Sequence, residues 1–188
     1  MRAVGIILAG GDSNKLRELT YRRAVAAMPI AGSYRSIDFA LSNMANSHVN
    51  KVAVLTQYNS RSLNEHLNSS KWWDFGRKQG GLYVFPPTIT KENGDWYRGT
   101  ADAIYQNLDF LKRCHEPYVI ITSGDAVYKL DYSKVLEYHM DTKADITVVC
   151  KEMESDTDFS RFGTIKVNDE MRIVEFEEKT SLPSSHLI

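Results

Sequence analysis

The sequence predicts an α/β fold with a largely parallel sheet, because short apolar runs alternate with stretches of helical periodicity. Apolar runs at residues 3–9, 52–55 and 118–121 are each followed by glycine or polar residues. Their apolarity is continuous rather than alternating, which is typical of strands buried on both faces of a sheet. Near the end, residues 163–167 and 172–176 flank a polar turn and predict an antiparallel hairpin.

The elements follow one another in a regular order along the first half of the chain. Residues 3–9 form the first predicted strand, which Gly10 and Gly11 end. Apolar residues then recur at helical spacing over residues 37–45, so a helix is expected there. A second strand is predicted at 52–55, and a short strand at 82–85 inside a loop-rich stretch.

The second half continues this alternation. Thr100 is the expected N-cap of a helix that carries Ile104, Leu108 and Leu111 on one face. The strand at 118–121 follows, and then a helix around residues 135–140. Residues 146–150 predict a fourth strand.

Bulk composition excludes several functional classes. The 188 residues are 43% hydrophobic and 25% charged with a net charge of −1, as in an ordinary globular domain. Charges are mixed along the chain, so no nucleic-acid partner is expected. Apolar stretches are too short for a membrane span, and the start is interpreted as a buried strand rather than a signal peptide. Two distant cysteines, Cys114 and Cys150, favour a reduced, cytoplasmic setting.

Candidate functional residues follow the predicted strands, because ligands of open α/β sheets bind outside the carboxyl ends of the strands. That rule indicates the loops at residues 10–15, 57–60 and 123–128. Gly10 and Gly11 would allow backbone N–H groups to approach a phosphate or a base edge. The loop fits neither GxGxxG nor the P-loop pattern, so a tight turn that serves only packing is the alternative.

Asp125 comes directly after a buried strand and a glycine. A carboxylate at this place is suited to ligate Mg²⁺, which would bridge phosphate oxygens during phosphoryl or nucleotidyl transfer. The alternative is an aspartate that only turns the chain and caps the next segment.

Two further groups are candidates. Residues 96–101 combine an aromatic pair, a cation, a glycine and a helix start, which suits an anion or a base edge. Aromatic pairs are also common in cores and interfaces. Glu178 and Lys179 could bind a sugar hydroxyl and a sugar phosphate, or form a solvated charge pair.

Together these stretches resemble the bacterial glucose-1-phosphate adenylyltransferases, also called ADP-glucose pyrophosphorylases, over essentially the whole chain. The matching stretches are residues 8–11, 34–39, 41–43, 54–58, 96–103, 123–125, 160–163 and 177–179. The resemblance implies a Rossmann-like nucleotidyltransferase domain with a mostly parallel sheet plus an antiparallel hairpin near the end.

The same resemblance implies an activity and site residues. ATP and glucose 1-phosphate would give ADP-glucose and pyrophosphate in glycogen biosynthesis, with Mg²⁺ as cofactor. Asp125 matches the metal-binding catalytic aspartate, and Lys15 the catalytic loop cation. The remaining matches are nucleotide-binding Leu8, Ala9, Gly10, Gly11, Gly99 and Thr100, sugar-phosphate-binding Tyr97, Gly163, Glu178 and Lys179, and the regulatory coupling residues Gln57 and Trp96.

The family also implies more protein than this chain. Residues 1–188 correspond to the N-terminal part of the catalytic domain, and the rest of that domain and a left-handed β-helix domain are expected beyond it. Members assemble as homo- or hetero-tetramers with a catalytic adenylyltransferase subunit.

Three departures lie at the phosphate end of the expected site. Ser13 replaces a glycine of the family loop, Lys15 replaces an arginine, and Val25 stands where catalytic members have a lysine. Ala126 replaces a histidine that usually follows the aspartate. These changes resemble the GlgD-type regulatory subunit, which is weakly active or inactive alone. An active adenylyltransferase subunit, such a regulatory subunit, and a transferase for another nucleotide or sugar phosphate therefore stay open.

Overall fold

The computed structural model describes residues 2–11, 14–68, 73–75, 80–88, 94–154, 157–180 and 183–188, without the side chains of Asn14, Lys15 and Arg161. The chain forms two compact units, Met1–Tyr138 and His139–Ile188. Each unit is described by itself. No helix in the described ranges is long and apolar enough to cross a membrane.

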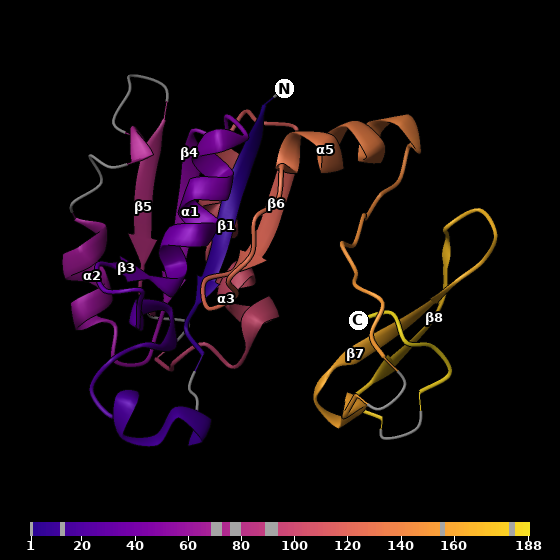
Figure 1. Ribbon diagram of the computed structural model, residues 1–188. Helices are drawn as coiled ribbons and strands as arrows, with labels where there is room; N and C mark the ends of the chain where they lie inside the picture. Colours follow the sequence, from indigo (N-terminus) through magenta and orange to yellow (C-terminus); the bar gives the residue numbers. More distant parts are fainter. Residues whose placement is uncertain are drawn as a thin grey trace. The chain divides into compact units, whose positions relative to one another are not determined.

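A four-stranded parallel sheet is the centre of the first unit (Figure 1). Its strands are β1 (Ala3–Ala9), β4 (Lys51–Thr56), β5 (Gly81–Phe85) and β6 (Tyr118–Ser123), in the order β5-β4-β1-β6. β1 pairs in parallel with both β4 and β6. The predicted α/β fold with a mostly parallel sheet is therefore confirmed.

Both faces of the sheet are covered, which explains the continuous apolar runs. Ile7 and Val54 belong to one core cluster together with residues of α1 (Ser36–Asn46). Ile6 and Leu55 belong to a second cluster together with Ala103. Because successive strand residues point to opposite faces, the residues of a central strand that is covered on both faces are mostly apolar on both sides.

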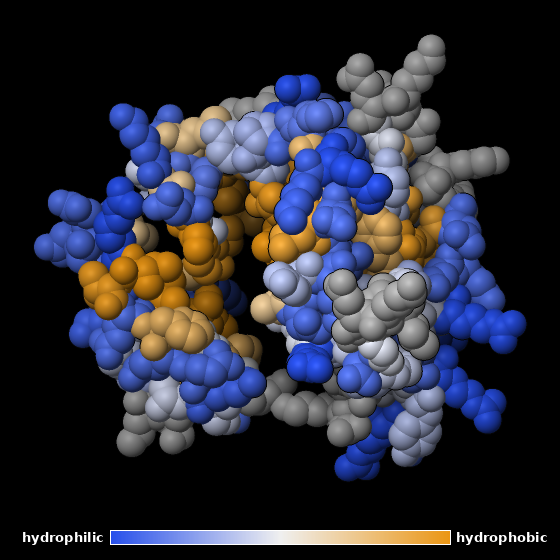
Figure 2. All heavy atoms as spheres, turned by 180° about the vertical axis from the view of Figure 1, so that it is seen from behind, coloured by the Kyte–Doolittle hydropathy of each residue, from blue (hydrophilic) through white to orange (hydrophobic). Residues whose placement is uncertain are grey.

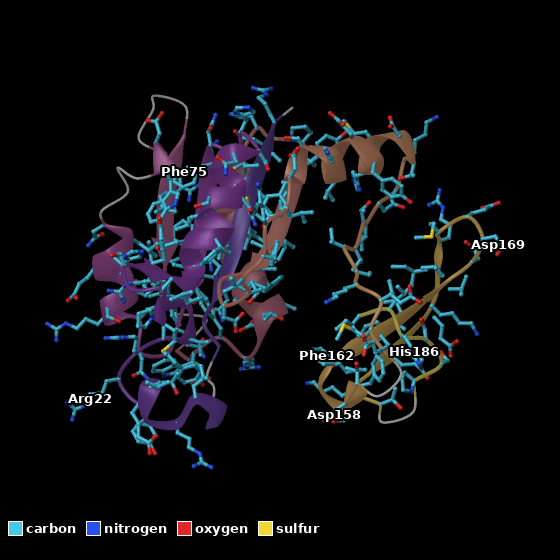
Figure 3. All side chains as sticks on the ribbon, in the orientation of Figure 1. Arg22, Phe75, Asp158, Phe162, Asp169 and His186 are labelled. Carbon is cyan, nitrogen blue, oxygen red and sulfur yellow. The ribbon has the colours of Figure 1, made fainter. Side chains whose placement is uncertain are left out.

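The flanking elements are short. On the α1 side lie α2 (Arg61–Leu67) and the buried ring of Phe75, which Figure 3 labels. The other cluster includes α3 (Thr100–Gln106) and α4 (Leu108–Arg113). Further elements are η1 (Asn14–Leu19), η2 (Val25–Ala27), β2 (Pro29–Ile30), β3 (Tyr34–Arg35) and α5 (Tyr132–Asp141), which ends in the second unit.

The second unit is built on the predicted hairpin, in which β7 (Gly163–Val167) pairs antiparallel with β8 (Ile173–Glu178). Before it, Asp158 caps η4 (Phe159–Arg161) by accepting a hydrogen bond from the Ser160 amide. The ring of His186 stacks on Phe159 with centroids 5.2 Å apart, and Figure 3 labels His186 near Asp158. The chain end therefore packs on the start of the hairpin.

The predicted strand at 146–150 is wrong. These residues have no ladder pairing, and Ile146 is 79% exposed. Only the following residues pair, where the Lys151 and Ile188 backbones exchange hydrogen bonds of 2.8 and 3.0 Å. Figure 2 shows apolar side chains of this unit at the surface, and Phe176 on β8 is 61% exposed. An apolar run forms a strand only where a sheet edge is available to it.

Two details of the predicted helix after residue 99 are also wrong. The N-cap is Gly99 rather than Thr100, and it makes no side-chain capping bond. The Asp102 side chain accepts the Arg98 amide hydrogen at 2.8 Å, just before the helix. The helix is divided at Asn107, whose side chain donates to the Ala103 carbonyl at 2.8 Å. Asparagine side chains that bond the local backbone compete with helical continuation.

Replacing Leu41 by alanine is expected to lower the free energy of unfolding by about 2–5 kcal/mol, because a fully buried leucine leaves a cavity. Leu41 lies on α1 in the main core cluster. Leu19→Ala is the control, since Leu19 is 60% exposed and should change stability by less than about 0.5 kcal/mol. Urea unfolding measures both, and equal effects would contradict the core assignment.

Candidate functional site

The candidate site is a cavity of about 500 Å³ in the first unit, at the carboxyl ends of the parallel strands. The strand order reverses between β1 and β6, because β4 and β5 extend the sheet on one side of β1 and β6 lies on the other. Ligands of open α/β sheets bind at such a reversal. The cavity is lined by Leu8, Ala9, Gly10, Gly11, Val25, Ala26, Leu55, Gln57, Tyr58, Tyr97, Arg98, Gly99, Thr100, Ala103, Ser123 and Asp125.

The glycine turn after β1 forms one side of this cavity. A Cβ atom on Gly10 would lie 3.1 Å from the Cβ of Gln57, closer than side chains normally pack. A Cβ atom on Gly11 would meet no atom within 4 Å. Gly10 therefore allows the turn to pass close to the end of β4, and Gly11 leaves open space in which a ligand can approach the backbone.

Asp125 forms the opposite side, at the end of β6. Its carboxylate is exposed and accepts a short hydrogen bond from the Ser123 hydroxyl. The preceding Gly124 donates its amide hydrogen to the Leu8 carbonyl at 2.9 Å, which extends the ladder between β6 and β1 by one residue. This bond ties the Asp125 loop to the strand that carries the glycine turn.

Gln57 and the aromatic residues near it connect two loops of the cavity. The Tyr97 amide donates to Gln57 Oε1 at 2.9 Å, and Gln57 Nε2 donates to the Tyr97 carbonyl at 3.4 Å. Beside them the rings of Tyr58 and Trp96 stack, with centroids 5.3 Å apart and an interplanar angle of 19°. The loop after β4 and the segment before α3 are thus joined by a paired amide contact and a ring stack.

Tyr97 is 8% exposed, and its hydroxyl has partners inside the protein. The hydroxyl donates to the Phe85 carbonyl at 3.3 Å and accepts from Asn107 Nδ2 at 3.0 Å. Burial raises the pKa of Tyr97 above its usual value, so the hydroxyl is neutral near pH 7. Tyr97 therefore fixes the position of the segment before α3 as well as lining the cavity.

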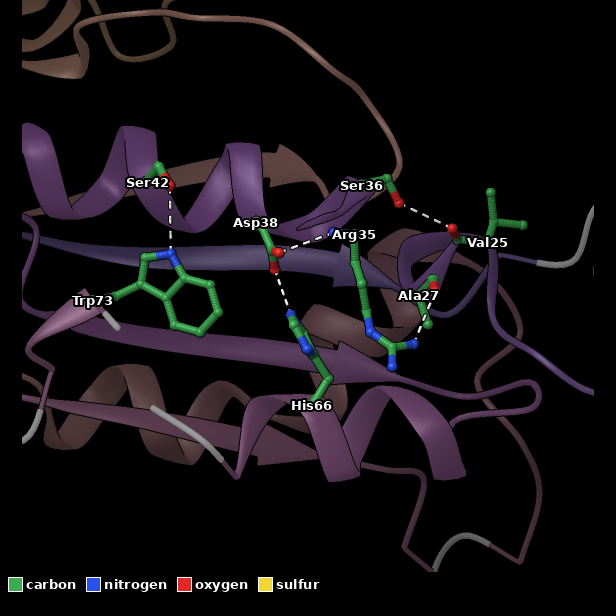
Figure 4. Close-up of polar contacts among 8 residues, drawn as sticks. All are labelled: Val25, Ala27, Arg35, Ser36, Asp38, Ser42, His66 and Trp73. Atoms are coloured by element: carbon green, nitrogen blue, oxygen red, sulfur yellow. Dashed lines mark hydrogen bonds and ion pairs between the residues drawn. The ribbon is translucent and has the colours of Figure 1, made fainter. Parts of the chain in front are cut away.

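A third side is apolar and comes from Val25 and Ala26 of η2. The hydroxyl of Ser36 donates to the Val25 carbonyl at 2.9 Å, and the Arg35 guanidinium donates to the Ala27 carbonyl at 3.0 Å (Figure 4). Since both bonds are made to main-chain oxygens, the start of α1 holds this wall independently of the side chain at position 25.

Asp38 in turn holds the start of α1. Its carboxylate accepts the Arg35 amide hydrogen at 2.9 Å and contacts His66 Nε2 at 2.6 Å (Figure 4). The ring centroids of His66 and Trp73 lie 5.9 Å apart in an edge-to-face arrangement, and the Trp73 indole donates to the Ser42 hydroxyl at 3.4 Å. A buried carboxylate thus has satisfied hydrogen bonds on both oxygens, as buried charges require.

The cavity brings together most of the residues that the sequence indicated in this unit. They are Leu8, Ala9, Gly10, Gly11, Gln57, Tyr97, Gly99, Thr100 and Asp125. Trp96 does not line the cavity itself but stacks on Tyr58, which does. The side chain of Lys15 and all of Ser13 lie outside the described residues.

The other predicted sugar-phosphate residues belong to the second unit. Gly163 is paired with Glu178 in the hairpin ladder, and the Lys179 amide donates to the Phe162 carbonyl at 2.9 Å. Lys179 Nζ lies 3.2 Å from Glu178 Oε1, with both side chains more than half exposed. These three residues are therefore gathered at one end of the hairpin.

Tyr58 lies in the loop 57–60 that the carboxyl-end rule indicated, and the structure adds its stack on Trp96. Sequence reasoning missed the role of Ser36 and Arg35 in holding the η2 wall. Ser36 and Arg35 reach carbonyls that lie 11 and 8 residues earlier in the chain, respectively, and no local pattern indicates such bonds.

Comparison with known proteins places the chain among nucleotide-transferring enzymes. A family model described as nucleotidyl transferase matches residues 4–188. A glucose-1-phosphate adenylyltransferase of Clostridium botulinum (strain Eklund 17B) is 47% identical over 184 residues, which are 98% of this chain and 47% of that protein. One of Bacillus thuringiensis (strain Al Hakam) is 46% identical over 186 residues, 99% of this chain and 49% of that protein. The chain spans about half the length of these curated relatives.

Gly124→Ala is expected to lower the free energy of unfolding by about 1–3 kcal/mol through overpacking. Its Cβ would lie 3.2 Å from Ile7 Cγ2, 3.3 Å from Ala9 Cβ and 3.4 Å from Ala26 Cβ. Gly99→Ala is the matched control, because its Cβ would meet no atom within 4 Å. Thermal unfolding of the two variants compares them, and the prediction fails if Gly99→Ala is destabilised as much as Gly124→Ala.

Proposed function

Because the chain belongs to the nucleotidyl transferase family, we propose that it is the N-terminal part of a glucose-1-phosphate adenylyltransferase. The full protein converts ATP and glucose 1-phosphate to ADP-glucose and pyrophosphate in glycogen biosynthesis in the cytoplasm. The observation that carries this proposal is the cavity at the strand reversal, which has a glycine turn on one side and Asp125 on the other. The names of the curated relatives support the substrates.

The reaction needs positioning more than covalent chemistry. A phosphate oxygen of glucose 1-phosphate attacks the α-phosphorus of ATP, a new P–O bond forms, and the bond to the bridging oxygen breaks as pyrophosphate leaves. Gly10 and Gly11 offer backbone to the nucleotide, and apolar Leu8, Ala9 and Ala103 exclude water from part of the cavity. Holding two reactants in line lowers the barrier by converting a bimolecular step into a unimolecular one.

Asp125 fits the Mg²⁺ that such a reaction uses. Its exposed carboxylate lines the cavity, and Mg²⁺ commonly takes one or two carboxylates plus phosphate oxygens. No group of three metal-binding side chains gathers within the described ranges. When bound, Mg²⁺ supplies charge neutralisation at the phosphates. The main chain of Gly124 keeps the carboxylate at the end of β6.

The remaining site residues are assigned roles in the same proposal. Tyr97, Gly163, Glu178 and Lys179 bind glucose 1-phosphate, and Lys15 and Thr100 with Gly99 contact the nucleotide. The proposal is supported for Lys179 and Glu178 by their exposed, adjacent side chains, which suit a phosphate and a sugar hydroxyl.

Gln57 and Trp96 are proposed to couple an activator to the site. The paired amide contact of Gln57 with the Tyr97 backbone and the stack of Trp96 on Tyr58 support this role. A movement of either loop would be transmitted to the cavity because these contacts join the two loops directly.

A GlgD-type regulatory subunit is the second candidate, and Val25 is the observation that favours it. Val25 lines the cavity, so an apolar side chain occupies a wall where catalytic members present lysine. Valine has no charge to offer a triphosphate. In this reading the subunit assembles with a catalytic partner as a hetero-tetramer, whereas an active subunit forms a homo- or hetero-tetramer.

Pyrophosphate release from ATP and glucose 1-phosphate, measured for the full-length protein alone and with a catalytic partner, separates the two candidates. Activity alone supports the active subunit, and Asp125→Asn should then lower kcat by about 10²–10³ because an electrostatic contact is lost. Inactivity alone, with a raised rate or activator response of the partner, supports the regulatory subunit. Neither activity nor an effect on the partner would refute both.

The double change Ser13→Gly with Val25→Lys is expected to raise the rate of pyrophosphate release by about 10²-fold, the contribution of one preorganised electrostatic contact. Val25 is half-buried on the cavity wall, so a lysine there reaches the cavity. Ser13→Gly with Val25→Met is the control, because methionine adds length without charge. No gain over that control would mean that the charge at position 25 does not limit the reaction.

A further inference from the structure

Two buried polar residues lie at the C-terminal end of α1. Asn43, in the helix, is 5% exposed, and Ser47, its C-cap, is 7% exposed. A buried polar group is destabilising unless it is hydrogen-bonded, so the partners of these two side chains indicate what they hold.

The side-chain amide of Asn43 forms two hydrogen bonds with the main chain of the segment that follows Asp125. Its Nδ2 donates to the Tyr128 carbonyl at 3.0 Å, and its Oδ1 accepts the Leu130 amide hydrogen at 3.3 Å. The partners are 85 and 87 residues away in sequence, so a side chain of α1 forms a two-point clamp on the main chain between β6 and α5.

Tyr128 is also held from the sheet. Its hydroxyl lies 2.5 Å from Thr122 Oγ1 on β6 and 2.9 Å from the Tyr132 hydroxyl. Burial raises the pKa of Tyr132 to about 12, so this hydroxyl stays protonated at neutral pH. At its other end the loop is held by the bond from the Gly124 amide to the Leu8 carbonyl at 2.9 Å.

From this geometry we infer that Asn43 is a positioning residue that sets the place of the Asp125 carboxylate in the cavity. Only Asp125, Ala126 and Val127 separate the two fixed points, Gly124 and Tyr128. With one end bonded to β1 and the other clamped by α1, the carboxylate has a narrow range of positions. The consequence for cation binding rests on the proposed function, and the clamp itself does not.

Ser47 provides a matched control. It caps the C-terminal end of α1 and is also buried, and its hydroxyl accepts the Tyr132 amide hydrogen at 2.8 Å. That bond anchors the start of α5 rather than the residues beside Asp125. Ser47→Ala therefore removes a comparable buried bond without releasing the Asp125 loop.

The first test is the affinity for ATP, measured by calorimetry on the full chain at increasing Mg²⁺ concentrations. Mg²⁺ is expected to increase the affinity for ATP, and Asn43→Ala should raise the Mg²⁺ concentration that gives half of this increase by about tenfold. That is the lower end of the loss in metal affinity seen when a residue that orients a metal ligand is removed. At saturating Mg²⁺ its ATP affinity should return to within about twofold of the parent, because the nucleotide turn is untouched. Ser47→Ala should match the parent, and an unchanged Mg²⁺ requirement in Asn43→Ala would overturn the inference.

The second test needs no ligand. Hydrogen exchange of the amides in residues 124–130 should be about tenfold faster in Asn43→Ala than in the parent or Ser47→Ala, because the local opening free energy falls. Unchanged exchange in that segment would also overturn the inference. If the parent binds no ATP at any Mg²⁺ concentration, the proposed function fails and exchange alone decides. Should Asn43→Ala not fold, Asn43→Asp replaces it in both tests, since it keeps the shape and loses the donor to Tyr128.

Discussion

The parallel pairing of β1 with two neighbours is the constraint on which the rest of the first unit depends. Its register sets Ala9 opposite Thr56 and Leu8 opposite Ser123. The glycine turn, Gln57 and Asp125 therefore leave the sheet at one edge within a few residues of each other. Because strand side chains alternate with a period of two, a slip of one residue would turn the apolar side chains of β1 to the wrong faces. Packing of the core thus fixes the geometry of the cavity.

Helix α1 transmits this constraint to the cavity walls. Its apolar side, with Leu41 and Met44, is buried in the core and fixes the helix against the sheet. Its polar side chains bond main-chain atoms of other segments: Ser36 holds the η2 wall, and Asn43 holds the loop after β6. Buried polar groups of this kind are satisfied only in one arrangement, so they specify loop positions that apolar packing alone would leave variable.

The sequence predicted the central strands, α1 and the hairpin because their burial produces a regular spacing of apolar residues along the chain. The strand prediction failed for residues 146–150, because an apolar run does not show whether a neighbouring strand is present to pair with it. The predicted N-cap of α3 failed as well, and there the Asp102 side chain accepts the Arg98 amide hydrogen. The carboxyl-end rule found the glycine turn and Asp125, which follow strands directly. The η2 wall follows no strand of the parallel sheet, and the bond from Ser36 to Val25 that places it spans 11 residues.

The same bonds explain how one scaffold could serve either a catalytic or a regulatory subunit. The η2 wall is held through the carbonyls of Val25 and Ala27, so its position does not depend on which side chain stands at residue 25. Exchange between lysine and valine there changes the charge that faces the cavity while the backbone contacts persist. Loss of positive charge affects phosphates more than an uncharged base or ribose, because the electrostatic contribution is specific to the charged group. Under the proposed function, the difference between the two candidates would then lie in side chains rather than in the fold.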